Sequence, residues 1–66
     1  MTLQEFLNEL KHKSLNISLC YENGAFIYAA TLGELLHWVH YIDFSSSKVD
    51  MVTPTGSQMY IYLLEE

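Results

Sequence analysis

An Asn-Gly pair inside an apolar stretch constrains the fold of this chain more than any other feature. Asn23 and Gly24 lie between two runs rich in β-branched and aromatic residues, 16–22 and 25–30. Such a pair is the strongest short-range signal for a β-hairpin, because a type I′ turn needs φ > 0 at both central residues. Asn and Gly are the residues that tolerate positive φ best. The sequence therefore predicts a hairpin over 16–30 with a two-residue turn.

The predicted turn fixes which residues of the hairpin share a face. Cross-strand partners point to the same side of a sheet. A two-residue loop predicts three partner pairs on one apolar face: Tyr21 with Phe26, Leu19 with Tyr28, and Ile17 with Ala30. We expect the opposite face to carry Ser18, Cys20, Glu22, Ala25, Ile27 and Ala29.

Two capping boxes predict two helices. The segments 2–5 and 31–34 both read Thr-x-x-Glu, and each precedes a Leu-rich run with helical spacing. We expect the first helix to end near Lys13 or Ser14, with Lys11 and Lys13 in its last turn, where cations suit the macrodipole. The second should run from Leu32 to about Ile42, on an apolar stripe that includes Val39. An internal duplication and convergence on the same capping signal explain the two similar openings equally well.

The rest of the chain predicts a second hairpin. Residues 48–53 alternate in polarity, 54–57 supply Pro and Gly turn chemistry, and 58–64 form the last strand. The sequence thus predicts one α+β domain over residues 1–66, in the order αββαββ, with two helices on one face of a four-stranded, mostly antiparallel sheet. This order fits a permuted ferredoxin-like plan, in which the second and fourth strands are central.

Two helices cover only one face of such a sheet. We expect the covered face to carry Ile17, Leu19, Tyr21, Phe26, Tyr28, Val49, Met51, Met59, Ile61 and Leu63. We expect the other face to show Cys20, Ile27, Val52, Tyr60 and Tyr62, rimmed by Glu22, Asp50 and Glu66. Tyrosines around an apolar centre are typical of protein-interaction surfaces. Ordinary half-buried sheet tyrosines, or closure of the face by a second copy of the chain, are the alternatives.

The charge composition argues against direct nucleic-acid binding. Eight acidic residues stand against three lysines and no arginine, for a net charge of −5. Nucleic-acid binding depends on Lys and Arg, which neutralise phosphates. A net charge of this size is also ordinary for the solubility of a small domain.

Cysteine content and the N-terminal sequence bear on location. Cys20 is alone, which excludes an intramolecular disulfide and favours a reducing compartment. The chain shows no signal-peptide pattern and no apolar run near the roughly 18 residues that a bilayer span needs. We expect a complete small open reading frame and a cytoplasmic protein that does not interact with membranes.

No catalytic or metal-binding motif is present in the sequence. His37 and His40 are three residues apart, but no CxxC or HExxH pattern accompanies them. Cys20 lies on an expected strand without a local electropositive group, which favours an unreactive thiol. The glycines are isolated, so no phosphate-binding loop is formed. We expect a protein that is not an enzyme and has no cofactor or metal.

In size, acidity, lack of arginine and lack of a catalytic motif, the chain resembles phage-encoded anti-CRISPR proteins. The resemblance implies a DNA mimic that inhibits a CRISPR effector by occupying its basic DNA-binding surface, in the cytoplasm of the host cell. Carboxylates can pair with the Lys and Arg that normally grip phosphates. The candidate partner-binding residues are Glu22, Asp43, Asp50, Tyr60, Tyr62, Glu65 and Glu66. The alternative is a homo-oligomeric accessory or structural protein, such as a homodimer, whose open sheet face is the self-association interface.

Overall fold

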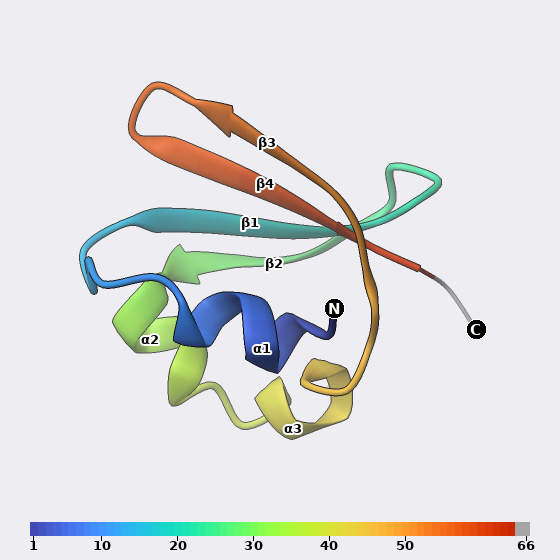
Figure 1. Cartoon of the computed structure of the whole chain (residues 1–66), viewed down its shortest axis with the longest axis horizontal. Coiled ribbons are helices and arrows are strands. Elements are labelled where there is room, and N and C mark those ends of the chain that lie inside the picture. Colours follow the sequence, from blue (N-terminus) through green and yellow to red (C-terminus); the bar gives the residue numbers. More distant parts are fainter. Residues whose placement is uncertain (65–66) are drawn as a thin grey trace.

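A mixed sheet with helices on one side is the framework of the protein (Figure 1). The computed structural model describes residues 1–64. In chain order the elements are α1 (Leu3–Asn8), β1 (Asn16–Tyr21), β2 (Phe26–Thr31), α2 (Leu32–Leu36), α3 (Tyr41–Phe44), β3 (Val49–Thr55) and β4 (Gln58–Leu63). The predicted α+β class and αββαββ order are confirmed, except that the second helix is divided into α2 and α3.

The sheet has the strand order β2-β1-β4-β3. β1 runs parallel to β4, and the two hairpin pairs are antiparallel. The predicted order is therefore wrong, because β1 is central and β2 is an edge. The prediction took apolar residues on both faces of β2 as the mark of a central strand. No residue of β2 is fully buried, and Phe26 and Ala29 are exposed, whereas β1 is buried over four consecutive residues.

The first hairpin is confirmed, but its turn is not type I′. The Gly24 amide donates to the Tyr21 carbonyl and the Tyr21 amide to the Ala25 carbonyl, both at 2.8 Å, which leaves a three-residue loop. Gly24 has φ +91°, whereas no non-glycine residue of the described chain has positive φ. Asn23 instead accepts a hydrogen bond from the Ala25 amide through Oδ1, at 2.9 Å. Three-residue hairpin loops commonly place one Gly at positive φ in this way.

A β-bulge in β2 compensates for the longer loop. Leu19 lies opposite Tyr28, as predicted, but the register then shifts and Cys20 lies opposite Phe26. Ile27 is the extra residue, and it packs against the core cluster. The prediction that Phe26 is a core residue is wrong, because Phe26 shares the face of Cys20 and is 67% exposed.

A second bulge, in β3, reverses the faces that Met51 and Val52 were predicted to occupy. Val49 lies opposite Leu63 and Met51 opposite Tyr62, so Asp50 is the extra residue. Met51 therefore points to the side without helices, and Val52, which follows it, points to the helix side and packs against the core cluster. The sequence placed Met51 inside and Val52 outside, and both assignments are wrong.

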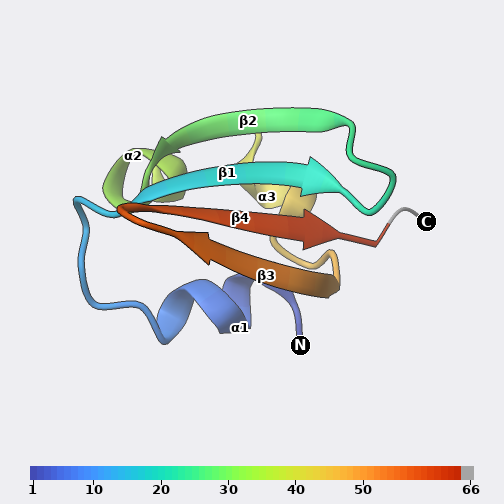
Figure 2. The same cartoon turned by 90° about the horizontal axis from the view of Figure 1, so that it is seen from above.

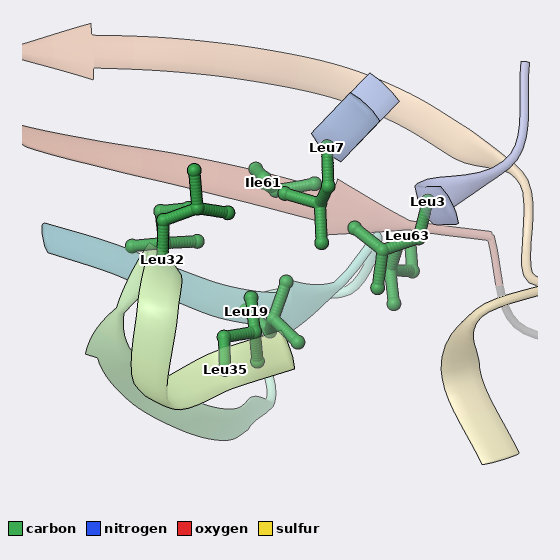
Figure 3. Packing of buried hydrophobic residues seen from close by; sticks show 8 residues of the cluster. Leu3, Leu7, Leu19, Leu32, Leu35, Ile61 and Leu63 are labelled. Carbon is green, nitrogen blue, oxygen red and sulfur yellow. The ribbon is translucent and has the colours of Figure 1, made fainter. Parts of the chain in front are cut away.

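The core lies between the helices and the inner face of β1 and β4 (Figure 3). Its fully buried members are leucines and isoleucines: Leu3 and Leu7 of α1, Leu32 and Leu35 of α2, Ile17 and Leu19 of β1, and Ile61 and Leu63 of β4. Both predicted capping boxes are present, at Thr2 with Glu5 and at Thr31 with Glu34. All three helices lie on this side of the sheet (Figures 1 and 2), so the other face carries no helix.

The helices are shorter than predicted. α1 ends at Asn8, so Lys11 and Lys13 lie beyond it. α2 ends at Leu36, where a run of residues of modest helix propensity (His-Trp-Val-His) begins. Val39 and Ile42, predicted on the helix stripe, are 79% and 77% exposed.

An aromatic stack holds the segment between α2 and α3 beneath β2. Trp38 stacks on Tyr28 at 4.1 Å between ring centroids and on Phe44 at 5.6 Å, with interplanar angles of 2° and 7°. Phe44 also contacts Tyr21 at 6.4 Å in a tilted geometry. Both Trp38 and Phe44 are half-buried and pack against the core cluster.

Candidate functional site

The face of the sheet that carries no helix is named the open face here, and two neighbouring rows of residues on it cross all four strands. Strand pairing puts Phe26, Cys20, Tyr62 and Met51 in one row and Ala29, Ser18, Tyr60 and Thr53 in the next. Both rows run from β2 through β1 and β4 to β3 (Figure 2). The eight residues of these two rows include no charged side chain.

The open face is buried along its central strands and exposed at its two edge strands. Ser18 and Cys20 are buried, because they are small and their larger neighbours shield them. Phe26 on one edge strand and Met51 on the other stand clear, at 67% and 52% exposed. Single exposed apolar side chains are normal, but a contiguous apolar row is typical of an interaction site. The open face can thus bind a partner by apolar contact over a flat area.

Two acidic residues lie at one end of the open face. Because β1 and β4 are parallel, the hairpin tip after β1 lies beside the end of β4 (Figure 2), and the Glu22 amide donates to the Leu63 carbonyl at 2.8 Å. Asp50 is the bulge residue next to Met51, at the same end. Both residues are exposed. The structure therefore brings Glu22 and Asp50 to the row that contains Tyr62.

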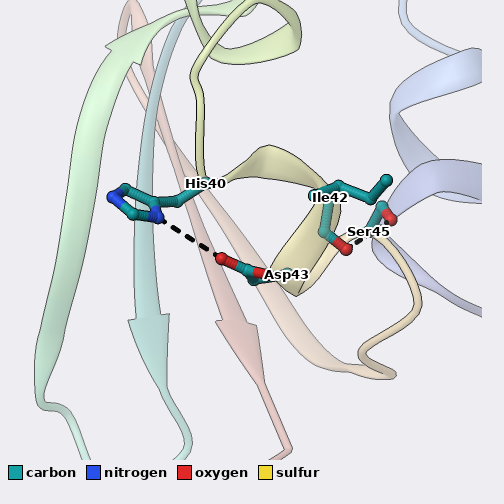
Figure 4. A network of polar contacts seen from close by, with 4 residues as sticks. All are labelled: His40, Ile42, Asp43 and Ser45. Atoms are coloured by element: carbon teal, nitrogen blue, oxygen red, sulfur yellow. Dashed lines mark hydrogen bonds and ion pairs between the residues drawn. The ribbon is translucent and has the colours of Figure 1, made fainter.

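The remaining candidate residues divide into three groups. Tyr60 lies on the open face and its hydroxyl donates to Gln58 Oε1 at 3.3 Å. Asp43 lies on α3 in the helix layer, away from the open face, with its carboxylate 3.3 Å from His40 Nδ1 (Figure 4). Glu65 and Glu66 lie outside the described residues.

The described part of the chain offers no enclosed site. Within residues 1–64 no pocket is formed, and no three His, Cys, Asp or Glu side chains gather where they could hold a metal ion. The hydrogen bonds of Glu5 with the Thr2 backbone and hydroxyl lower the pKa of its carboxyl, and burial raises the pKa of the Tyr41 hydroxyl. Both groups belong to the helix layer. None of the described helices is both long and apolar enough to pass through a bilayer.

Sequence reasoning missed Phe26 and Met51 as surface residues, and each was displaced by a bulge. The Asn-Gly pair is compatible with a two- or a three-residue loop, so the sequence carried a signal that the register of Phe26 was ambiguous. No comparable signal marks the bulge at Asp50.

Comparisons of the chain with protein-family models, with curated proteins and with solved structures find no match. The open face and its acidic end are the features of the molecule that bear on function.

Proposed function

We propose that this protein is a small binding protein that inhibits a nucleic-acid-handling complex by docking its open face on a basic, DNA-binding surface. The observation that carries the proposal is the uncharged row from Phe26 to Met51 and, beside it at the end of the sheet where β1 and β4 stop, the exposed residues Glu22 and Asp50. The general character shared with anti-CRISPR proteins makes a CRISPR effector the first class of partner to test.

Each part of the surface has a separate role in binding. The apolar row supplies surface that leaves water on docking, with Phe26 and Met51 as the most accessible side chains. The carboxylates of Glu22 and Asp50 can pair with Lys or Arg side chains that otherwise contact phosphates. The net charge of −5 would speed association with a basic surface.

The size of the surface sets how much of the protein a partner must cover. A standard interface buries about 800 Å² on each side. That is roughly a fifth of the 4260 Å² of accessible surface. A partner that covers the open face and its acidic end would need to bury an area of this order.

A charge-reversal experiment tests the proposal. The double variant Glu22→Lys with Asp50→Lys changes the acidic end, and Asp43→Lys is the matched control because Asp43 lies in the helix layer. DNA binding and cleavage by a panel of purified CRISPR effector complexes would be measured with each protein. We expect the natural protein and Asp43→Lys to inhibit at least one effector, and the double variant to lose at least tenfold in affinity. Inhibition of no effector, or equal inhibition by the double variant, would contradict the proposal.

A second candidate function is a homo-oligomeric accessory protein whose open faces close on each other. The absence of charge from the two rows favours it, since two apolar faces can pack without burying an ionised group. Light scattering separates the candidates. A tight dimer that dissociates on Tyr60→Ser or Tyr62→Ser would support closure of the face, and a dimer that is unaffected by both would exclude it.

A further inference from the structure

The two edges of the sheet differ in how they are protected. At the β3 edge the N-terminal segment covers the start of the strand, where the Val49 amide donates to the Met1 carbonyl at 2.9 Å and Thr2 bridges Lys48. The bulge at Asp50 interrupts this edge further, and Pro54 has no amide hydrogen to offer. Charges, bulges, proline and covering segments are the devices by which proteins prevent pairing at an edge.

The β2 edge has far less protection. Its sequence, Phe-Ile-Tyr-Ala-Ala-Thr, contains no charged residue and no proline. Figure 2 draws no part of residues 1–64 beyond the outer side of β2. The bulge at Ile27 lies near the start of the strand, and Tyr28 to Thr31 pair regularly with β1. Unpaired amide and carbonyl groups on such an edge are a template for another strand.

We propose that β2 pairs with β2 of a second copy of this chain, antiparallel, so that two sheets join into one of eight strands. A neutral strand is suited to pairing with itself, because no like charges are placed opposite each other although each copy carries −5. The corresponding pairing of β3 would bring two copies of Asp50 into the same interface. An interface that uses the same residues on both sides closes as a two-fold dimer.

The faces of the sheet fix the register of this pairing. Opposite residues of antiparallel strands point to one side, and Ala29 lies on the open face while Tyr28 and Ala30 lie on the core face. A two-fold axis through Ala29 places Ala29 opposite Ala29 of the second copy and Tyr28 opposite Ala30 of the second copy, which keeps every residue on its own face. A slip of one residue would oppose Tyr28 to Ala29 and mix the faces.

This arrangement has a consequence for binding. The two-fold axis stands perpendicular to the sheet, so both open faces lie on the same side of the dimer. The exposed rings of Phe26 from the two copies then belong to one continuous surface. Two linked faces bind a partner with two sites more tightly than one face does.

Cysteine cross-linking tests the register directly. Opposite Cα atoms in antiparallel strands are about 4.5–5.5 Å apart, which suits a disulfide. We expect Ala29→Cys, in a Cys20→Ala background, to form a covalent dimer under mild oxidation. The matched control is Thr53→Cys in the same background, because Thr53 lies in the same row of the sheet on the opposite edge. Equal cross-linking at both positions, or none at position 29, would overturn the proposal.

Sedimentation velocity over a concentration series gives a second readout. The pairing edge is short, so we expect a dimer with a dissociation constant of about micromolar or weaker. Ala29→Lys places two positive charges opposite each other at the two-fold axis and should weaken the dimer at least tenfold. Thr53→Lys should leave the dimer affinity unchanged. Circular dichroism checks that both variants fold. A natural protein that stays monomeric at millimolar concentration would refute the dimer and leave the proposed partner of the open face untouched. Dissociation by Thr53→Lys would instead indicate face-to-face closure.

Discussion

The register of the first hairpin can be tested by comparing two phenylalanines. The predicted two-residue turn placed Phe26 in the core, whereas the structure leaves it 67% exposed and puts Phe44 in the aromatic stack. Replacing each with leucine keeps most of the side-chain volume and removes the ring. We expect Phe44→Leu to destabilise the protein strongly and Phe26→Leu to have almost no effect.

The expected magnitudes follow from the ring contacts. Phe44 stacks with Trp38 at 5.6 Å and contacts Tyr21 at 6.4 Å. Each aromatic pair contributes roughly 0.5–1.5 kcal/mol beyond its buried area, so Phe44→Leu should lower the free energy of unfolding by about 2 kcal/mol. An exposed side chain usually changes that free energy by less than about 0.5 kcal/mol. A chain of this length has a total stability of about 3–10 kcal/mol, so both variants should remain folded without denaturant.

Urea denaturation followed by the fluorescence of Trp38, the one tryptophan in the sequence, provides the assay. With a denaturant slope of about 1 kcal/mol per molar, the midpoint should fall by about 2 M for Phe44→Leu and by less than about 0.5 M for Phe26→Leu. Circular dichroism checks the same midpoints without depending on the environment of Trp38. Equal losses in the two variants would show that Phe26 is buried and that the bulge is misplaced.

Two further predictions concern the turn and the first capping box. Gly24→Ala should destabilise the protein by about 1 kcal/mol, because Gly24 has φ +91°. Gly33→Ala should be neutral or stabilising by up to about 1 kcal/mol, since a Cβ there makes only ordinary van der Waals contacts with Lys13, the nearest being its carbonyl oxygen at 3.6 Å. Urea denaturation that ranks the two variants the other way would refute this. The pKa of Glu5 in the folded state is lowered below its ordinary value of 4.5, mainly by the backbone hydrogen bond with Thr2. The ionised Glu5 carboxylate therefore stabilises the fold above pH 4.5, and this stabilisation is lost as the pH falls through the folded-state pKa. Glu5→Gln should therefore be less stable than the natural protein at neutral pH and equally stable well below pH 4.5, and a difference that persists in acid would contradict the linkage.

Local patterns were sufficient to predict the elements whose signals are short-range. The capping boxes at Thr2 and Thr31 start helices where the sequence predicts them, because their hydrogen bonds join residues only three apart. The inward-facing Ile17 and Leu19 are also where the alternation places them. The acidic hairpin tip at Glu22 is exposed because a turn lies at the end of two strands.

The faces of β2 and β3 could not be read from alternation alone. A single bulge moves every residue beyond it to the other side of the sheet, which is how Phe26 and Met51 reached the open face. Where an extra residue is inserted depends on how the strand packs against its neighbours, and the sequence of one strand does not contain that information. The sequence therefore predicted the exposed positions of Glu22 and Asp50 and placed Cys20, Tyr60 and Tyr62 on the open face, but it missed the two most exposed apolar residues there, Phe26 and Met51.

The sequence by itself determined the order of the elements, the two capping boxes and the existence of the first hairpin, because each depends on residues close together in the chain. Only the tertiary structure decided that β1 and β4 pair in parallel, which makes β2 an edge and gathers Glu22, Asp50 and Tyr62 at one end. It also separated Asp43 from them, on α3 beside His40. Strand pairing joins residues far apart in sequence, and several orders bury the same leucines. The choice among them is made by the packing of the whole domain.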